Sequence, residues 1–157
     1  LGDTDRGFRA AMMALDGGRI GIASQALGVG LAALELATAH VAEHPALARS
    51  QAVQWRLADM ATDLDAGRLL ALQAAWRKEN GLEFTREASM AKMFCSERAV
   101  RACDAALEVL GELGNDAAAR AEQLVRDVRV TMIYEGTSEV QRIVISRDIA
   151  RRFGEQA

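Results

Sequence analysis

Apolar side chains recur at helical spacing along most of the chain. Between residues 8 and 38 they repeat every three or four positions, and this pattern predicts a long amphipathic helix. A second helix is expected over residues 46–78, because His44-Pro45 interrupts the pattern and the residue before a proline is disfavoured in a helix. Residues 85–110 predict a third helix and residues 118–129 a shorter one.

The last helix is expected after a turn at Glu135, where Val140, Ile143 and Val144 resume the helical spacing. We find no segment with the alternation that is typical of a β-strand. Long helices joined by short loops predict an all-α, up-and-down four-helix bundle with an additional short helix. A length of 157 residues fits one domain, residues 1–157, with its core between about residues 7 and 152.

The charge and the cysteines limit the class of protein. A formal net charge of -3 argues against a nucleic-acid surface, because phosphate binding requires a basic excess. We find no apolar run of the roughly 20 residues that a membrane span requires, so no membrane contact is expected. Cys95 and Cys103 would lie about 12 Å apart on one helix, which is too far for a disulfide. Buried thiols of this kind suit a reducing, cytoplasmic location.

The run IYEGTSE at residues 133–139 is the strongest candidate for chemistry. Gly136 breaks the helical pattern, and Thr137 or Ser138 can accept a hydrogen bond from the free N–H groups of the following helix. A carboxylate on a short turn held by a rigid scaffold is a common position for a catalytic base, which makes Glu135 a candidate. An ordinary acidic helix N-terminus is the alternative, because the helix dipole favours negative charge there. The motif by itself leaves both interpretations open.

Three other patterns have competing explanations. His40 and His44 have zinc-ligand spacing, but the chain contains no third histidine, so a solvated helix end is favoured and no metal is expected. The GVG run at residues 28–30 lies in a helical pattern without a preceding strand, which favours close helix packing over nucleotide binding. Asp16 and Arg19 share a helix face and predict either an ion pair or a clamp for a ligand.

Several short motifs occur together in a characteristic order. They are Gly7-Phe8, Asp16-x-x-Arg19, Gln51-Ala52-Val53-Gln54, Leu57-Ala58-Asp59-Met60, Ala88-x-x-Ala91-Lys92, Arg126-Asp127 and the run at residues 133–137. In this order they resemble the C-terminal helical domain of the acyl-CoA dehydrogenase family, from about residue 7 to residue 152. The family fold also has an N-terminal helical domain and a middle β-domain. Neither is expected in this sequence, so the chain resembles a fragment of a larger flavoenzyme.

The resemblance implies FAD-dependent dehydrogenation of an acyl-CoA thioester between its α and β carbons. Glu135 would be the base that removes the α proton, while the β hydrogen leaves as hydride to the flavin. Some branches of the family carry the base directly before the first-helix arginine. That position is Gly18 here, so Glu135 is the matching candidate.

The same resemblance implies roles for the neighbouring residues. The residues expected to contact the acyl-CoA substrate are Asp16, Arg19, Tyr134, Gly136 and Arg147. The residues expected near the diphosphate and ADP part of FAD are Thr137 and Glu139.

Two segments depart from the family pattern. The Arg-x-x-Phe-Gly motif, which in the family reaches the flavin of a neighbouring subunit, is absent from residues 44–49. The usual Gln-x-x-Gly-Gly segment has Glu108 and Glu112 in place of a glutamine and a glycine, and these charges would repel a pyrophosphate. The resemblance implies a dimer or tetramer of acyl-CoA dehydrogenase subunits. Two alternatives are expected: a hetero-oligomer in which a different subunit supplies the flavin contacts, or an atypical homo-oligomer that holds flavin by other contacts.

A non-catalytic bundle for oligomerisation or acyl-CoA binding, derived from the same scaffold, is the alternative function. The chain on its own is expected to be inactive and to retain no FAD, because the middle domain is missing. Electron-transfer flavoprotein and oxygen are both candidates for the electron acceptor, and the motifs do not define the acyl chain length.

Overall fold

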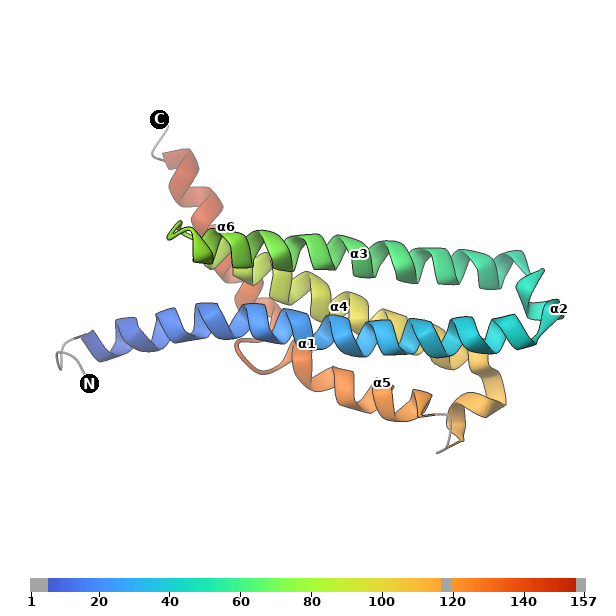
Figure 1. Cartoon of the computed structure of the whole chain (residues 1–157). Coiled ribbons are helices and arrows are strands. Elements are labelled where there is room, and N and C mark those ends of the chain that lie inside the picture. Colours follow the sequence, from blue (N-terminus) through green and yellow to red (C-terminus); the bar gives the residue numbers. More distant parts are fainter. Residues whose placement is uncertain (1–5, 117–119, 155–157) are drawn as a thin grey trace.

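The computed structural model describes residues 6–116 and 120–154. These residues form six α-helices, two short 3₁₀ helices and no strand. Four helices run up and down side by side, namely α1 (Gly7–Glu43), α3 (Gln51–Glu79), α4 (Thr85–Leu110) and α5 (Ala121–Arg129) (Figure 1). The all-α, up-and-down bundle predicted from the sequence is confirmed.

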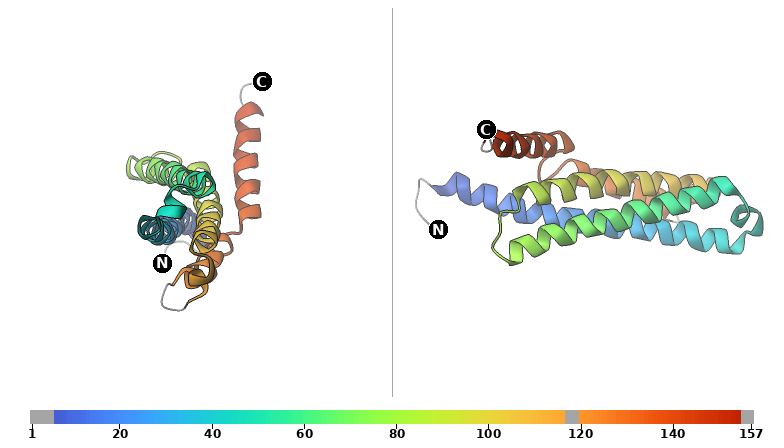
Figure 2. Two further views of the ribbon diagram at one scale, coloured as in Figure 1. Left: turned by 90° about the vertical axis from the view of Figure 1, so that its right-hand side faces the viewer. Right: turned by 90° about the horizontal axis from the view of Figure 1, so that it is seen from above.

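The remaining elements connect the bundle helices or leave the bundle. Helix α2 (Pro45–Ala48) lies between α1 and α3, and the 3₁₀ helix η2 (Gly111–Asn115) follows α4. Helix α6 (Ser138–Gly154) points away from the bundle axis (Figure 2). Helix α4 contacts α1, α3, α5 and α6, so it is the central helix of the fold. The predicted start of the shorter helix, Ala118, lies outside the described residues, and α5 begins at Ala121.

The second helix differs from its predicted extent of residues 46–78. The chain forms the single turn α2, leaves helical geometry at Ser50 (φ -74°, ψ 115°) and begins α3 at Gln51. Pro45 explains the separate turn, because its fixed φ suits the first position of a helix. The extended backbone of Ser50 then redirects the chain, so that α3 returns antiparallel to α1 (Figure 1).

Buried small side chains are frequent on α1 and α4, two helices that contact each other. The buried alanines are Ala23, Ala26, Ala33 and Ala37 on α1 and Ala88, Ala91, Ala99, Ala102 and Ala106 on α4. A Cβ added at Gly30 would lie 2.6 Å from Leu64 Cδ2 and 3.3 Å from the Ala99 Cα. The close packing predicted for the GVG run is therefore confirmed at Gly30, whereas an added Cβ at Gly28 meets nothing within 4 Å.

Helix α1 is more apolar than the sequence pattern suggests. Its stretch Ala10–Glu43 is long and apolar enough, by length and composition, to cross a membrane, so the expectation that no run reaches that length is wrong. In this fold the helix packs on α3 and α4 and carries a buried arginine, Arg19. Its first turns extend past the bundle, where Phe8 and Met13 are exposed (Figure 1). Of its most apolar window, 33% is buried inside the described structure.

Gly30→Ala is expected to destabilise the fold, and Gly28→Ala is not. The added methyl at residue 30 must displace Leu64 or the α4 backbone, and overpacking of this kind costs about 1–3 kcal/mol. The same methyl at residue 28 meets no atom and improves helix propensity by up to about 1 kcal/mol. Urea unfolding followed by circular dichroism should give a lower unfolding free energy for Gly30→Ala than for Gly28→Ala. Equal values would contradict the close contact between α1 and α4.

Candidate active site

A turn at residues 134–137, between the 3₁₀ helix η3 (Val130–Met132) and α6, holds Glu135 in an unusual backbone conformation. Glu135 has a φ of 54° and Gly136 a φ of 91°, so two successive residues are left-handed. For a non-glycine residue this conformation costs roughly 1–2 kcal/mol. A Cβ added at Gly136 would also lie 2.7 Å from Gln141 Nε2, so this position requires glycine. Strain retained at a carboxylate-bearing residue is typical of a functional site.

The Glu135 carboxylate lies against α1 at Gly18. A Cβ built on Gly18 would be 2.6 Å from Oε2, 2.7 Å from Cδ and 2.9 Å from Oε1 of Glu135. The carboxylate therefore occupies the space that any larger side chain at residue 18 would fill. Its Oε2 is buried and has no hydrogen-bond partner among the described residues, which leaves a lone pair free to accept a proton.

Two fully buried side chains donate hydrogen bonds to the carbonyl groups of this turn. Lys92 of α4 donates from Nζ to the Gly136 carbonyl at 2.8 Å. Gln141 of α6 donates from Nε2 to the same carbonyl at 2.9 Å and to the Glu135 carbonyl at 3.1 Å. Both side chains are 0 % exposed, which is unusual for a lysine. The backbone of the turn is thus held from two helices.

The sequence patterns assign neither donor to the site. Lys92 occurs only in the family motif Ala88-x-x-Ala91-Lys92, and Gln141 lies outside the motifs. The signal that could have identified Lys92 is its position on the small, apolar face of its helix, three residues before Cys95. For Gln141 we find no comparable signal, because its contacts depend on the turn geometry.

Burial lowers the pKa of Lys92 to about 8, and the positive charge of Arg19 adds to this effect. The carboxylates of Glu139, Glu135 and Glu97 act in the opposite direction, since each favours the ammonium form. Lys92 is therefore mostly protonated at neutral pH, and it loses its charge at a lower pH than an ordinary lysine.

Asp16 and Arg19 form an ion pair inside the interface between α1 and α4. The Arg19 guanidinium donates from Nη1 to Asp16 Oδ1 at 2.7 Å and to the Ser89 hydroxyl at 3.2 Å. The other Asp16 oxygen accepts from the Thr85 hydroxyl at 2.6 Å. The ion pair, one of the two alternatives predicted for these residues, is therefore present, and it joins α1 to α4. Contact of either residue with a CoA arm stays a prediction.

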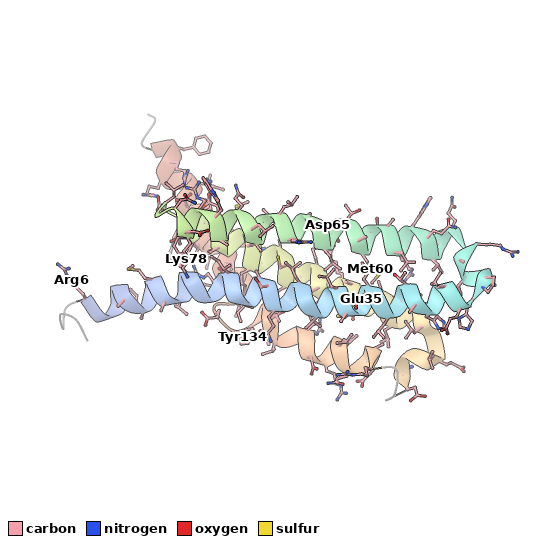
Figure 3. All side chains as sticks on the ribbon, viewed as in Figure 1. Arg6, Glu35, Met60, Asp65, Lys78 and Tyr134 are labelled. Carbon is pink, nitrogen blue, oxygen red and sulfur yellow. The ribbon has the colours of Figure 1, made fainter. Side chains whose placement is uncertain are left out.

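Tyr134 belongs to the turn, whereas Arg147 lies further along α6. The Tyr134 hydroxyl donates to Gln25 Oε1 of α1, and Figure 3 shows Tyr134 beside that helix. Arg147 is exposed on α6. It lies nine residues after Ser138, which corresponds to about 14 Å along the helix. The structure therefore places the Tyr134 side chain between the turn and α1, whereas Arg147 is remote from Glu135 along α6.

At the N-terminus of α6, some polar side chains have hydrogen-bond partners and one has none in the described part of the chain. Thr137 Oγ1 accepts a long hydrogen bond, 3.5 Å, from the backbone N–H of Val140, so Thr137 caps the helix as one of the two predicted candidates. The Ser138 hydroxyl is buried and has no partner among the described residues. A hydrogen bond from the Thr137 hydroxyl lowers the pKa of the exposed Glu139.

The two histidines lie at the C-terminal end of α1, and the two cysteines are buried on α4. The rings of His40 and His44 are tilted against each other with centroids 4.1 Å apart, and His44 Nδ1 lies 2.7 Å from the His40 carbonyl oxygen. Among the described residues we find no group of three or more side chains suited to a metal ion. Cys95 and Cys103 are free and buried as predicted, and burial raises the pKa of each thiol to about 12.

Comparison with known proteins identifies the family. Residues 5–150 match the family model of the acyl-CoA dehydrogenase C-terminal domain. The chain belongs to this family. The resemblance inferred from the short motifs is thereby confirmed, and so is the all-α bundle that the resemblance implies.

Relatives in the acyl-CoA dehydrogenase family match nearly the whole chain. The mitochondrial short-chain specific acyl-CoA dehydrogenase of Bos taurus is 45% identical over 157 residues, covering 98% of this chain and 38% of that protein. The structure of butyryl-CoA dehydrogenase from Megasphaera elsdenii has a TM-score of 0.93 and 38% identity, covering 96% of this chain and 40% of that one.

A further structural neighbour comes from work on an electron transferring flavoprotein of Acidaminococcus fermentans. It has a TM-score of 0.94 and 41% identity, and the match covers 96% of this chain and 41% of that one. The acyl-CoA dehydrogenase domain described here thus spans between 38% and 41% of the length of these relatives.

The buried Lys92 predicts a pH dependence of stability. Its pKa is about 8 in the folded chain and 10.5 unfolded, so between these values the unfolded chain binds more protons and stability rises with pH. The free energy of unfolding increases by about 3 kcal/mol between pH 8 and pH 10.5, at roughly 1.4 kcal/mol per pKa unit. Lys92→Met removes this titration. The unfolding free energy of the wild type minus that of Lys92→Met should therefore increase from pH 8 to pH 10.5, measured by urea unfolding. A constant difference would contradict the depressed pKa.

Proposed function

We propose that the protein containing this chain is an FAD-dependent acyl-CoA dehydrogenase and that Glu135 is its catalytic base. A general base needs a free lone pair within reach of the proton that it removes. The buried, unpaired Oε2 of Glu135, held against Gly18, is the observation that carries this proposal. Membership of the acyl-CoA dehydrogenase family supports the same reaction class.

In the proposed reaction, Glu135 accepts the α proton of an acyl-CoA thioester. The electron pair of the α C–H bond becomes the new bond between Cα and Cβ as the β C–H bond breaks. FAD, when bound, takes up the β hydrogen with its electron pair as hydride. Gly18 provides the space in which the carboxylate lies, and the left-handed turn directs it there. The strained backbone thus contributes positioning, which is a large part of the rate that an enzyme gains.

The first residues of α6 suit part of the FAD molecule. A helix N-terminus presents free N–H groups to a phosphate, and the buried Ser138 hydroxyl lacks a partner that a cofactor could supply. Glu139 carries a negative charge with a lowered pKa, so it suits a hydroxyl or N–H donor better than a phosphate oxygen. We assign Thr137 and Ser138 to the diphosphate and Glu139 to the nucleoside part. The chain on its own is not expected to retain FAD.

The relatives guide the choice of substrate and partners. Their names, short-chain specific acyl-CoA dehydrogenase and butyryl-CoA dehydrogenase, support a short saturated acyl-CoA as the first substrate to test. An electron-transfer flavoprotein is the proposed electron acceptor, because a structural neighbour comes from work on such a protein. Homo- or hetero-oligomers with other dehydrogenase subunits would supply the flavin contacts that residues 44–49 lack. The contacts of Asp16, Arg19 and Arg147 with CoA, and a cytoplasmic location, stay predictions.

Glu135→Gln is expected to lower turnover by about 100- to 10,000-fold, because the amide cannot accept the proton and a general base contributes a factor of this size. The measurement is dye reduction by butyryl-CoA in the protein that contains this chain. FAD content, read from the flavin absorption band, serves as the control for folding. Unchanged turnover would favour the alternative function, a non-catalytic bundle for oligomerisation or acyl-CoA binding.

Gly18→Ala tests whether the carboxylate must lie against α1. The added methyl would overlap the Glu135 carboxylate and displace it, and a misplacement of about 1 Å can lower the rate by about 100-fold. Gly21→Ala is the matched control, because an added Cβ there meets nothing within 4 Å. We expect kcat to fall in Gly18→Ala and to stay near the wild-type value in Gly21→Ala. Equal kcat values in both variants would exclude the described position of Glu135 as the reactive one.

A further inference from the structure

We propose that Lys92 and Gln141 are positioning residues, which hold the backbone of the 134–137 turn so that the Glu135 carboxylate faces Gly18. This inference rests on the proposed role of Glu135 as the base. Neither residue touches the carboxylate through a hydrogen bond of its own. Both act on the main chain that carries it.

The backbone of the turn needs external support. Glu135 is left-handed although it has a side chain, and Gly136 follows in the same region. A residue in this conformation returns to the favoured regions unless the surrounding structure prevents it. Since φ and ψ set the direction of the Cα–Cβ bond, such a relaxation would turn the carboxylate away from α1.

The hydrogen bonds of Lys92 and Gln141 supply this support. The two donors converge on the Gly136 carbonyl oxygen, and Gln141 also reaches the Glu135 carbonyl. They come from α4 and α6, so the turn is fixed relative to both helices. The two carbonyl groups cannot rotate without leaving two buried donors unsatisfied, which is unfavourable.

The burial of Lys92 is difficult to explain by stability alone. A fully buried ammonium is costly, and here it is bonded to a neutral carbonyl rather than to a carboxylate. The neighbours of Lys92 on the same helix face are Ala88, Ala91 and Cys95, which are all fully buried. An apolar side chain of similar length would suit these three neighbours better, whereas the carboxylates around the turn favour the charged lysine. A cation retained there points to a requirement of the turn.

The experiment uses the FAD-loaded protein that contains this chain, with butyryl-CoA as the probe. In Lys92→Met we expect kcat to fall by about 10- to 100-fold, since a displaced base costs a factor of this order. KM should stay within about threefold, because the substrate contacts are unchanged. A residue that supports only the fold would instead lower FAD content and the active fraction. The proposal would be overturned if Lys92→Met had the kcat of the wild type while Glu135→Gln had a lowered kcat.

The chain offers a matched control. It contains one other lysine, Lys78, which is exposed on α3 and labelled in Figure 3. Lys78→Met makes the same chemical change outside the turn. Lys78 Nζ lies against Gly17 of α1 and forms no hydrogen bond with the described turn, so we expect kcat to stay near the wild-type value. An equal loss of kcat in both variants would show a general effect of charge removal and would contradict the positioning role.

Gln141→Leu is the second variant, in case Lys92→Met does not fold. It removes the other donor at similar volume, and we expect kcat to fall while KM changes little. Because both donors share one carbonyl, the effect of the double variant should depart from the product of the two single effects by at least about threefold. If the fold-loss of kcat in the double variant equalled the product of the two single losses, the two residues would act independently. That result would contradict the proposal that both hold the same turn.

A crystal structure of Lys92→Met, or of Gln141→Leu, separates this inference from the proposed function. We expect the Glu135 carboxylate to leave Gly18 and the φ of Glu135 to become negative. This outcome would support the positioning role of Lys92 and Gln141 whatever the turnover of Glu135→Gln. Full turnover in Glu135→Gln would separately contradict the proposed role of Glu135 as the base. An unchanged turn in the variant structure would overturn the positioning role, whatever the kinetics.

Discussion

The hydrogen bond from the buried Lys92 to the Gly136 carbonyl connects the central helix of the fold to the candidate base. Helix α4 contacts every long helix of the described structure, so its position sets the frame for the whole bundle. The hydrogen bond of Lys92 fixes the 134–137 turn, whose backbone is strained, relative to this central helix. The location of the Glu135 carboxylate therefore depends on the core, although the turn itself is only half-buried.

The position of α1 on α4 is the second requirement of the site. Glu135 faces Gly18 only if α1 has the correct axial register and lies close to α4. Close approach is permitted by the alanines of both helices and by Gly30. The register is specified by polar contacts, because the pair of Asp16 and Arg19 bonds to two hydroxyl groups of α4. Apolar packing thus sets the distance between the helices, and hydrogen bonds set their alignment.

Much of the fold and part of the site follow from the sequence. Helical periodicity predicts the long helices, and the glycine after Glu135 predicts the turn and the new helix. Sequence patterns do not predict that the Glu135 carboxylate meets Gly18, because this contact depends on how distant helices pack. The roles of Lys92 and Gln141 depend on the same packing. The break at Ser50 is likewise a tertiary effect, since the residues around it are compatible with one continuous helix.

The departures from the family pattern are separated in space from the candidate base. Glu108 lies sixteen residues after Lys92 on α4, which corresponds to about 24 Å along the helix. There it forms an ion pair with Arg56 of α3. The altered segment at residues 44–49 contains α2, at the same end of the bundle (Figure 1). A change at that end leaves the contacts of Lys92, Gln141 and Gly18 intact. The proposed base and the proposed flavin contacts between subunits can therefore vary independently, which is compatible with the proposal of a flavin site completed by a different polypeptide.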